Sequence, residues 1–98
     1  MNYSFHPDAE VEFVEAIDYY EARGTNLGLD FSIEVHETIE RIAAHPAAWS
    51  KIDGEMRRCQ TKRYPYGVVY AIEGDGIYIL AVMHNRRHPD YWKSRTRL

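Results

Sequence analysis

The chain contains an uninterrupted apolar run near its C-terminal end, and this run limits the folds open to it. Residues Ile77–Met83 (IYILAVM) follow one another without a charged side chain. A strand buried on one face alternates apolar and polar residues, whereas a strand buried on both faces is apolar throughout. The run is too short to cross a bilayer as a helix. The sequence therefore predicts that Ile77–Met83 is a central strand of a sheet covered on both sides.

The segments before this strand predict two helices followed by antiparallel strands. Apolar residues recur at helical spacing in two stretches, and Gly24-Thr25-Asn26 separates them, with Asn26 as the expected N-cap of the second helix. Gly74-Asp75-Gly76 is typical of a tight hairpin turn. The expected elements are a strand over Tyr3–Phe5, helices over Pro7–Arg23 and from Leu27 to just before Pro46, a loop over Trp49–Gly54, and strands over Met56–Arg63, Tyr66–Glu73 and Ile77–His84.

These elements predict an α+β fold. Helices with one apolar side must pack on the apolar side of a sheet, so we expect a helical hairpin on a small, mostly antiparallel sheet in the order β-α-α-β-β-β. Residues 1–98 are expected to form a single domain. Cys59 is the only cysteine, and no basic and then apolar leader follows Met1, so a cytoplasmic protein without a disulfide is expected.

Charge is divided unevenly between the two halves of the chain. Residues 1–50 hold ten acidic and two basic side chains, a net charge of −8, whereas residues 51–98 hold five acidic and ten basic ones, a net charge of +5. Such a division indicates either a face that binds an anionic partner or two faces that compensate each other.

Basic residues cluster at two places that the predicted sheet brings close together. Alternation along the strand from Met56 places Arg57 and Arg63 on one face and Arg58 and Lys62 on the other. Arg86 and Arg87 follow the last strand. Together they predict a concave basic site, although a charged edge strand protected against aggregation would have the same pattern. The aromatic residues beside these bases are Tyr64, Tyr66, Tyr91 and Trp92.

Other signals for catalysis are weak. Tyr91 and Trp92 suit either a partner surface or a seal over the core, and His84 or His88 could act as an acid or base beside the arginines. Cys59 has no base nearby in sequence and is expected in the core. The chain has no glycine-rich phosphate loop, serine elbow or metal-ligand spacing, so neither a metal nor a cofactor is predicted.

Several segments resemble the RelE/ParE superfamily of type II toxin–antitoxin toxins. The most specific are KRYPYGVVY and AVMHNRRHPDYW, and the opening HPDAEVEFVEAIDYYEARGTNLGLDF and the middle ERIAAHPAAW are similar as well. The resemblance covers nearly the whole chain. It implies a helical hairpin against a small antiparallel sheet, a growth-inhibiting activity, and a cognate antitoxin protein that neutralises it.

The resemblance leaves the molecular target open. In the RelE-like branch, toxins are ribosome-dependent, metal-independent mRNA endoribonucleases, and here Arg57, Arg58, Lys62, Arg63, Arg86, Arg87 and Tyr91 would be the catalytic candidates. In the ParE-like branch, toxins poison DNA gyrase without catalysis, and Arg86, Arg87, Tyr91 and Trp92 would bind gyrase or the antitoxin. The acidic helical half and basic sheet half favour the ParE-like branch slightly. A relative that only binds antitoxin and is not toxic is the third hypothesis.

Overall fold

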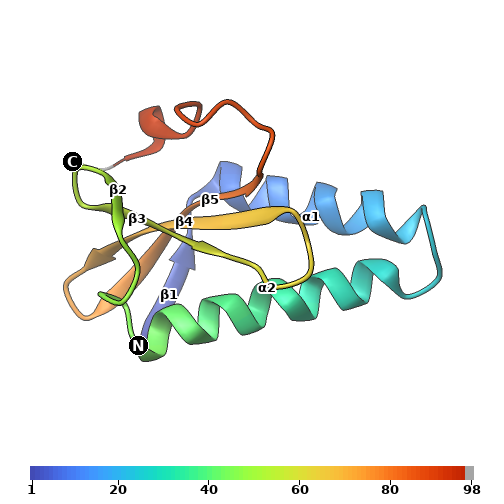
Figure 1. The fold of residues 1–98 in the computed structure, drawn as a ribbon, viewed down its shortest axis with the longest axis horizontal. Helices are drawn as coiled ribbons and strands as arrows, with labels where there is room; N and C mark the ends of the chain where they lie inside the picture. The colour runs from blue at the N-terminus through green and yellow to red at the C-terminus, as the bar shows by residue number, and fades with distance from the viewer. Residues whose placement is uncertain (97–98) are drawn as a thin grey trace.

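The computed structural model describes residues 1–96, and Figure 1 shows a helical hairpin lying along a twisted sheet. In chain order the elements are β1 (Asn2–Phe5), α1 (Pro7–Glu21), α2 (Leu27–Ala44), β2 (Lys51–Asp53), β3 (Met56–Gln60), β4 (Tyr66–Glu73), β5 (Gly76–His84) and a 3-10 turn at Lys93–Arg95. The predicted α+β class, with helices packed on a mostly antiparallel sheet, is confirmed.

The backbone N–H groups at the start of each helix are capped by a side chain that lies outside that helix. His6 caps α1, because its Nδ1 accepts the backbone N–H of Asp8 at 3.0 Å. Asn26 is the N-cap residue of α2, as predicted, but its side chain makes no capping hydrogen bond and its backbone is left-handed at φ 65°. Glu21 of α1 supplies the cap instead. Its carboxylate accepts the N–H groups of Asn26 and Gly28, each at 3.0 Å.

The apolar run lies in the middle of the sheet, as predicted. Strand order is β1-β5-β4-β3-β2, with β1 parallel to β5 and all other neighbours antiparallel. Strands β4 and β5 form the predicted hairpin, in which Glu73 pairs with Gly76. The register then shifts so that Val69 pairs with Ala81 and Tyr70 with Ile79, which leaves Leu80 as an extra residue. This β-bulge places Leu80 and Ala81 on the same face.

Two separate cores cover the two faces of the sheet. On one face, apolar side chains of α1 and α2 pack on β3, β4 and β5, with Phe31, Ile39 and Tyr70 fully buried. On the other face, Met56, Val69, Leu80 and Met83 pack with Trp92, which comes from the C-terminal segment after β5. Ile77–Met83 therefore contact apolar side chains on both faces of the sheet. The helices, the sheet and the C-terminal segment form three layers.

Two strand assignments from the sequence are wrong. The segment expected as a loop contains β2, a short edge strand whose three residues are all exposed and which therefore has no apolar signature. Strand β3 ends at Gln60, so Lys62 and Arg63 lie in the connection to β4. The prediction that Lys62 and Arg63 lie on opposite faces of a strand is therefore wrong.

Candidate functional site

Arg86 and Arg87 lie in the turn that follows β5, and their surroundings differ. Arg86 is exposed, and its guanidinium has no carboxylate partner among residues 1–96. Arg87 forms an ion pair with Glu12 of α1 (Nη1 to Oε2, 3.7 Å) and stacks over the Tyr91 ring at 4.0 Å. Arg86 is thus available to a partner, whereas Arg87 already has a carboxylate and an aromatic ring in contact.

Glu12 also joins the C-terminal segment to the uncovered edge of β5. Strand β1 pairs with β5 only as far as Ile79, so the edge beyond it lacks a strand neighbour. Glu12 fills this place: its carboxylate accepts the Val82 N–H at 3.2 Å and binds Arg95 in a bidentate pair at 2.8 and 3.0 Å. Arg95 donates in turn to the Leu80 carbonyl at 3.1 Å. We call Glu12 and Arg95 the edge clasp.

The structure removes Trp92 and most of Tyr91 from the free surface. Trp92 is 1 % exposed and seals the second core, which was one of its two predicted roles. The Tyr91 hydroxyl is buried, without a hydrogen-bond partner among the described residues. Burial and the nearby Glu12 carboxylate raise the pKa of Tyr91 above its ordinary value. A phenol in this environment is a poor proton shuttle near neutral pH, because its pKa lies far from the operating pH.

Arg57 and Arg58 point to opposite faces of the sheet. Arg57 lies opposite Tyr70 on the helical face, where it donates to the carbonyl groups of Ala47 and Trp49. Arg58 lies on the other face and crosses β4 at Gly67 to reach the Asn85 side chain. A Cβ at residue 67 would collide with the Arg58 guanidinium, so glycine makes this crossing possible. Arg58 is thereby brought beside the turn that contains Arg86.

Lys62 and Arg63 lie against α2, away from the turn after β5. Arg63 binds Asp30 through both terminal nitrogens, at 3.0 and 3.2 Å, and Glu34 through Nε at 3.1 Å. Glu34 also accepts the backbone N–H of Lys62 at 3.0 Å. Hydrogen bonds from Tyr64 and Arg63 lower the pKa of Asp30, so this carboxylate stays charged. The Lys62 ammonium group projects free of these contacts.

The predicted concave basic site is therefore assembled only in part. The fold brings Arg58 to the turn with Arg86 and Arg87, but it directs Arg57 to the other face and places Lys62 and Arg63 at α2. His84 and His88 each use Nδ1 to accept a backbone N–H two residues ahead, from Arg86 at 3.0 Å and from Asp90 at 3.2 Å. Both histidines thus shape the turn, and only their Nε2 atoms remain for other chemistry.

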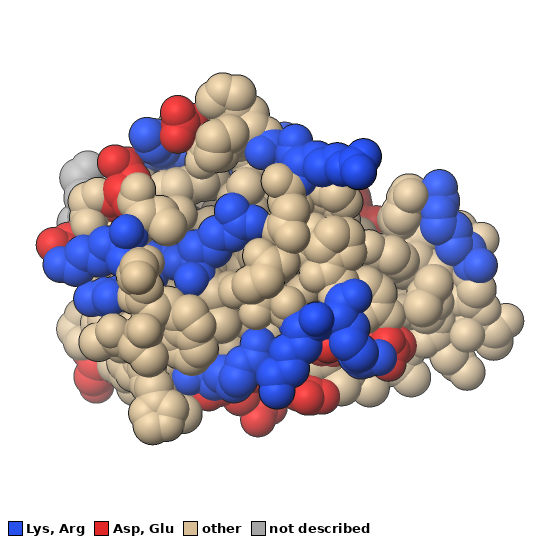
Figure 2. Space-filling model, in the orientation of Figure 1, with Lys and Arg blue, Asp and Glu red and all other residues tan. Residues whose placement is uncertain are grey.

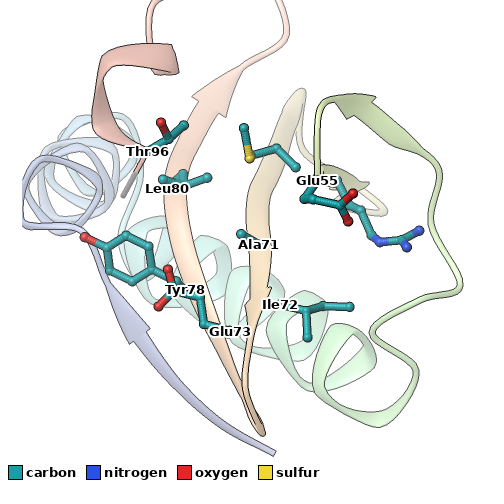
Figure 3. Close-up of a pocket in the computed structure, with 9 residues that line it drawn as sticks. Glu55, Ala71, Ile72, Glu73, Tyr78, Leu80 and Thr96 are labelled. Carbon is teal, nitrogen blue, oxygen red and sulfur yellow. The ribbon is translucent and has the colours of Figure 1, made fainter. Parts of the chain in front are cut away.

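The described residues form no cluster of three or more His, Cys, Asp or Glu side chains suited to a metal ion. Figure 3 shows the hollow on the second face of the sheet, where Ala71, Tyr78 and Leu80 form its floor and Glu55 and Thr96 lie at its rim. Its volume is about 110 Å³. Small-molecule sites usually measure several hundred cubic ångströms, so this hollow is a packing gap rather than a substrate pocket.

Two structural features could not be predicted from the sequence. The edge clasp joins residues 12 and 95, whose sequence separation hides their contact. The second feature is a groove around Trp49, between the end of α2 and β3, which Arg41 and Lys62 border. The basic residues in the second half of the chain indicated a basic surface, but their position beside Arg41 depends on how α2 packs on the sheet.

A family model described as the ParE toxin of the type II toxin–antitoxin system parDE matches residues 3–89. The chain belongs to the ParE toxin family. The residues outside the match include Tyr91, Trp92 and Arg95, so the tail that seals the second core lies beyond the family model.

Among solved structures, the chain is similar to one from the chromosomal ParDE toxin–antitoxin system of P. aeruginosa, with a TM-score of 0.74 and 18% sequence identity. The superposition covers 86% of this chain and 95% of that one, so the two share the ParE fold over nearly their full lengths. No curated protein matches the sequence significantly. Within residues 1–96, no helix is long and apolar enough to span a membrane.

Proposed function

We propose that this ParE toxin poisons DNA gyrase and is held inactive by a cognate antitoxin protein. The observation that carries the proposal is the match to the ParE family model over residues 3–89. ParE-like toxins act by binding gyrase rather than by cutting RNA, so a set of convergent catalytic groups is not required.

The arrangement of the basic residues supports this choice over an mRNA endoribonuclease. General acid–base cleavage of RNA needs cations and a proton-transfer group directed at one phosphate. Here Arg57 and Arg58 occupy opposite faces, Arg63 is engaged by Asp30 and Glu34, and the Tyr91 hydroxyl is buried. The RelE-like candidates therefore do not surround a common reaction centre.

We assign the gyrase contact to the turn after β5. Arg86 is exposed and without a carboxylate partner, and Arg87 beside it is 54% exposed while stacked on Tyr91. An exposed arginine in a turn is well suited to a partner's carboxylate or phosphate, because its planar guanidinium can form two parallel hydrogen bonds with either group. Arg58 holds this turn by donating a hydrogen bond to the Asn85 side chain.

The test is inhibition of purified gyrase in a supercoiling assay, combined with induction of the gene in cells without antitoxin. The expected result is loss of supercoiling activity in vitro, and DNA-damage signalling with filamentation in cells. Arg86→Ala should weaken inhibition about tenfold, the usual effect of removing one interface arginine. Arg23→Ala is the matched control, since Arg23 is exposed in the connection between α1 and α2 and stacks only on Tyr19.

Each alternative has its own readout in the same cells. Transcripts cut within translated codons, with supercoiling unaffected, would reject the gyrase proposal in favour of the endoribonuclease. Normal growth after induction, together with a stable antitoxin complex, would indicate a binding module without toxicity.

A further inference from the structure

Residues 88–96, which follow the turn after β5, cover the second core of the sheet and are joined to it by side chains alone. We call these residues the strap. Their backbone hydrogen bonds stay within the strap, as from the Tyr91 N–H to the His88 carbonyl and from the Arg95 N–H to the Trp92 carbonyl, and within residues 1–96 none reaches α1, α2 or the sheet. Figure 1 shows the strap, in red, as a layer outside the strands. It can therefore leave the sheet without breaking any hydrogen bond between strands.

The strap contains both of the buried side-chain polar atoms that lack a hydrogen-bond partner within residues 1–96, the Tyr91 hydroxyl and the Trp92 indole N–H. Buried polar groups are nearly always paired, so two unpaired ones on adjacent residues require an explanation. Closure buries the large Trp92 ring, which favours the closed form, but it also removes two polar groups from water, which favours an open form. The remaining contacts of the strap therefore decide the balance between the two forms.

Glu12 of α1 makes the closest ionic contact between the strap and the rest of the protein. Its largely buried carboxylate binds Arg95 in a bidentate pair at 2.8 and 3.0 Å. The other ionic contacts of the strap with the main fold are longer. Lys93 lies 3.7 Å from Asp53, and Arg95 Nε lies 4.0 Å from the Asp8 carboxylate. Both of these carboxylates are exposed, so solvent weakens the two contacts, and removal of the Glu12 charge should release the strap.

The turn before the strap is held independently of it. The Asn85 backbone N–H donates to the Pro65 carbonyl at 2.8 Å, and the Asn85 side chain accepts a hydrogen bond from Arg58. The Arg87 N–H donates to the His84 carbonyl at 2.9 Å. None of these contacts involves residues 88–96, so all of them can persist when the strap leaves the sheet. The hinge of the strap therefore lies directly after Arg87.

We propose that the strap opens as a unit while the helices and the sheet stay folded, and that Glu12 is the latch that keeps it closed. The open form is the minor one, because the pair of Glu12 with Arg95 and the buried Trp92 ring favour closure. Opening gives the polar groups of Tyr91 and Trp92 access to water, and it uncovers the apolar second face of the sheet, which includes Leu80.

Opening of the strap is linked to the turn that we assign to gyrase. Arg87 stacks over the Tyr91 ring at 4.0 Å, so the turn and the strap share a contact. Arg87 also pairs with Glu12 at 3.7 Å, but Arg95 binds Glu12 more closely and through two hydrogen bonds, so loss of the Arg87 pair changes the latch little. A partner anion that draws Arg87 away from Tyr91 therefore favours opening, and an open strap in turn frees Arg87 for the partner.

An anionic partner group suits the distribution of charge over the molecule. Figure 2 shows Lys and Arg across the middle of one face, with Asp and Glu mainly at its margins. The link between the turn and the strap rests on the proposed function, whereas the opening itself does not.

The first experiment tests the opening without reference to toxicity, by hydrogen exchange in the isotope-labelled full-length protein followed by NMR. The probe is the Trp92 indole N–H, which is buried in the closed form, and the references are the backbone amides of Val35 and Ile39 in the buried side of α2. We expect the Trp92 indole to exchange at least about tenfold faster than these amides. Its rate should depend little on low concentrations of urea, because opening exposes less surface than global unfolding does.

Three variants test the cause of the exchange. Glu12→Gln should raise the exchange rate of the Trp92 indole about a hundredfold, because the Arg95 guanidinium loses its main counter-charge. Glu10→Gln, on the exposed side of α1, is the matched control and should leave the rate within about twofold. Tyr91→Phe should lower the rate about tenfold, since it removes a buried hydroxyl without a partner among the described residues.

Exchange of the Trp92 indole at the rate of the Ile39 amide, with the same dependence on urea, would overturn the proposal, because the strap would then open only when the whole protein unfolds. An unchanged rate in Glu12→Gln would overturn Glu12 as the latch. If Glu12→Gln does not fold, Tyr91→Phe decides, and a rate equal to or above that of the wild type would overturn the proposal.

The second experiment tests the link to the turn. Deuterium uptake of residues 88–96 is measured by mass spectrometry for the full-length protein alone and with an excess of purified gyrase. We expect uptake about fivefold faster in the complex. In Arg87→Ala, which lacks the contact with Tyr91, uptake should be equally fast with and without gyrase.

Slower or unchanged uptake in the wild-type complex would overturn the link between the turn and the strap. Absence of any complex with gyrase would instead contradict the proposed function, and exchange of the Trp92 indole would still decide whether the strap opens.

Discussion

The Tyr70 hydroxyl is an example of a single polar group that the core holds in one protonation state. Tyr70 is fully buried between the sheet and the helices, and it donates to the Pro46 carbonyl at 2.6 Å. Burial raises the pKa of Tyr70 from 10.0 to about 12. Its neutral form is therefore favoured in the folded state, and the contribution to stability is fully present below the unfolded pKa and is lost as pH rises from about 10 to 12.

Tyr70→Phe should make the free energy of unfolding less sensitive to alkaline pH between 10 and 12. It should also cost about 1 kcal/mol at neutral pH, since the Pro46 carbonyl loses its donor. Urea denaturation at several pH values measures both effects. Tyr3→Phe, at an exposed position of β1, is the control. An unchanged alkaline slope in Tyr70→Phe would contradict the role of this hydroxyl, leaving Tyr64, whose pKa is also raised to about 12, as the source.

At the scale of single residues, the sequence predicts which side chains matter better than it predicts what surrounds them in the fold. Arg86 was placed correctly at the exposed end of a core strand, because that placement follows from the strand alone. Tyr91 and Trp92 could not be assigned, because their burial depends on the path of a tail with no regular pattern. The pairing of Glu12 with Arg95 could not be foreseen either, since the sequence of an amphipathic helix does not reveal which acidic residue meets a distant cation.

Elements with their own periodicity were predictable, and elements that depend on neighbours were not. Both helices and the β4–β5 hairpin follow from apolar spacing and a turn motif, and their bounds agree within about two residues. Strand β2 has no apolar alternation and exists because its backbone pairs with β3. Lys62 and Arg63 were assigned to a strand because basic residues do not mark where pairing stops, and their contacts with Glu34 lie across the fold.

The helical hairpin depends on a close approach of α2 to α1 at Gly28. A Cβ at this residue would lie 2.6 Å from the Ile17 carbonyl oxygen and 2.9 Å from Glu21 Cβ. Gly28→Ala should therefore force the helices apart and disturb the Glu21 cap, at a cost of about 1–3 kcal/mol in thermal or urea unfolding. At Gly24 an added Cβ meets nothing closer than 3.7 Å, so Gly24→Ala should be close to neutral. Equal stability of the two variants would show that the hairpin relaxes freely.

At the scale of the whole molecule, the edge clasp holds the three layers together. Glu12 belongs to the helical layer, Val82 and Leu80 to the sheet, and Arg95 to the tail. The Glu12 and Arg95 side chains are only 14% and 12% exposed, so their ion pair is shielded from solvent. The clasp also occupies backbone groups that an edge strand would otherwise offer to another chain.

Glu12→Gln should lower the free energy of unfolding by about 3 kcal/mol, because the largely buried Arg95 guanidinium then keeps only the exposed Asp8 carboxylate, 4.0 Å from its Nε, as a counter-charge. Glu10→Gln, on the exposed side of α1, should change it by less than about 0.5 kcal/mol. In a double-mutant cycle with Arg95→Met, the double variant should be no less stable than Glu12→Gln alone. Strictly additive losses would mean that Glu12 and Arg95 stabilise the protein independently.

The parallel pairing of β1 with β5 also has a consequence for synthesis of the protein. Asn2–Phe5 are translated before both helices, whereas their partners Gly76–Ile79 are translated after them. At about 5–20 residues per second, the first strand waits several seconds for the last one. Pairing between residues that lie far apart in the sequence is also slow. The sheet of a nascent toxin therefore stays without its β1–β5 pairing until β5 has been made, so the helical hairpin is translated before the sheet that it covers can be completed.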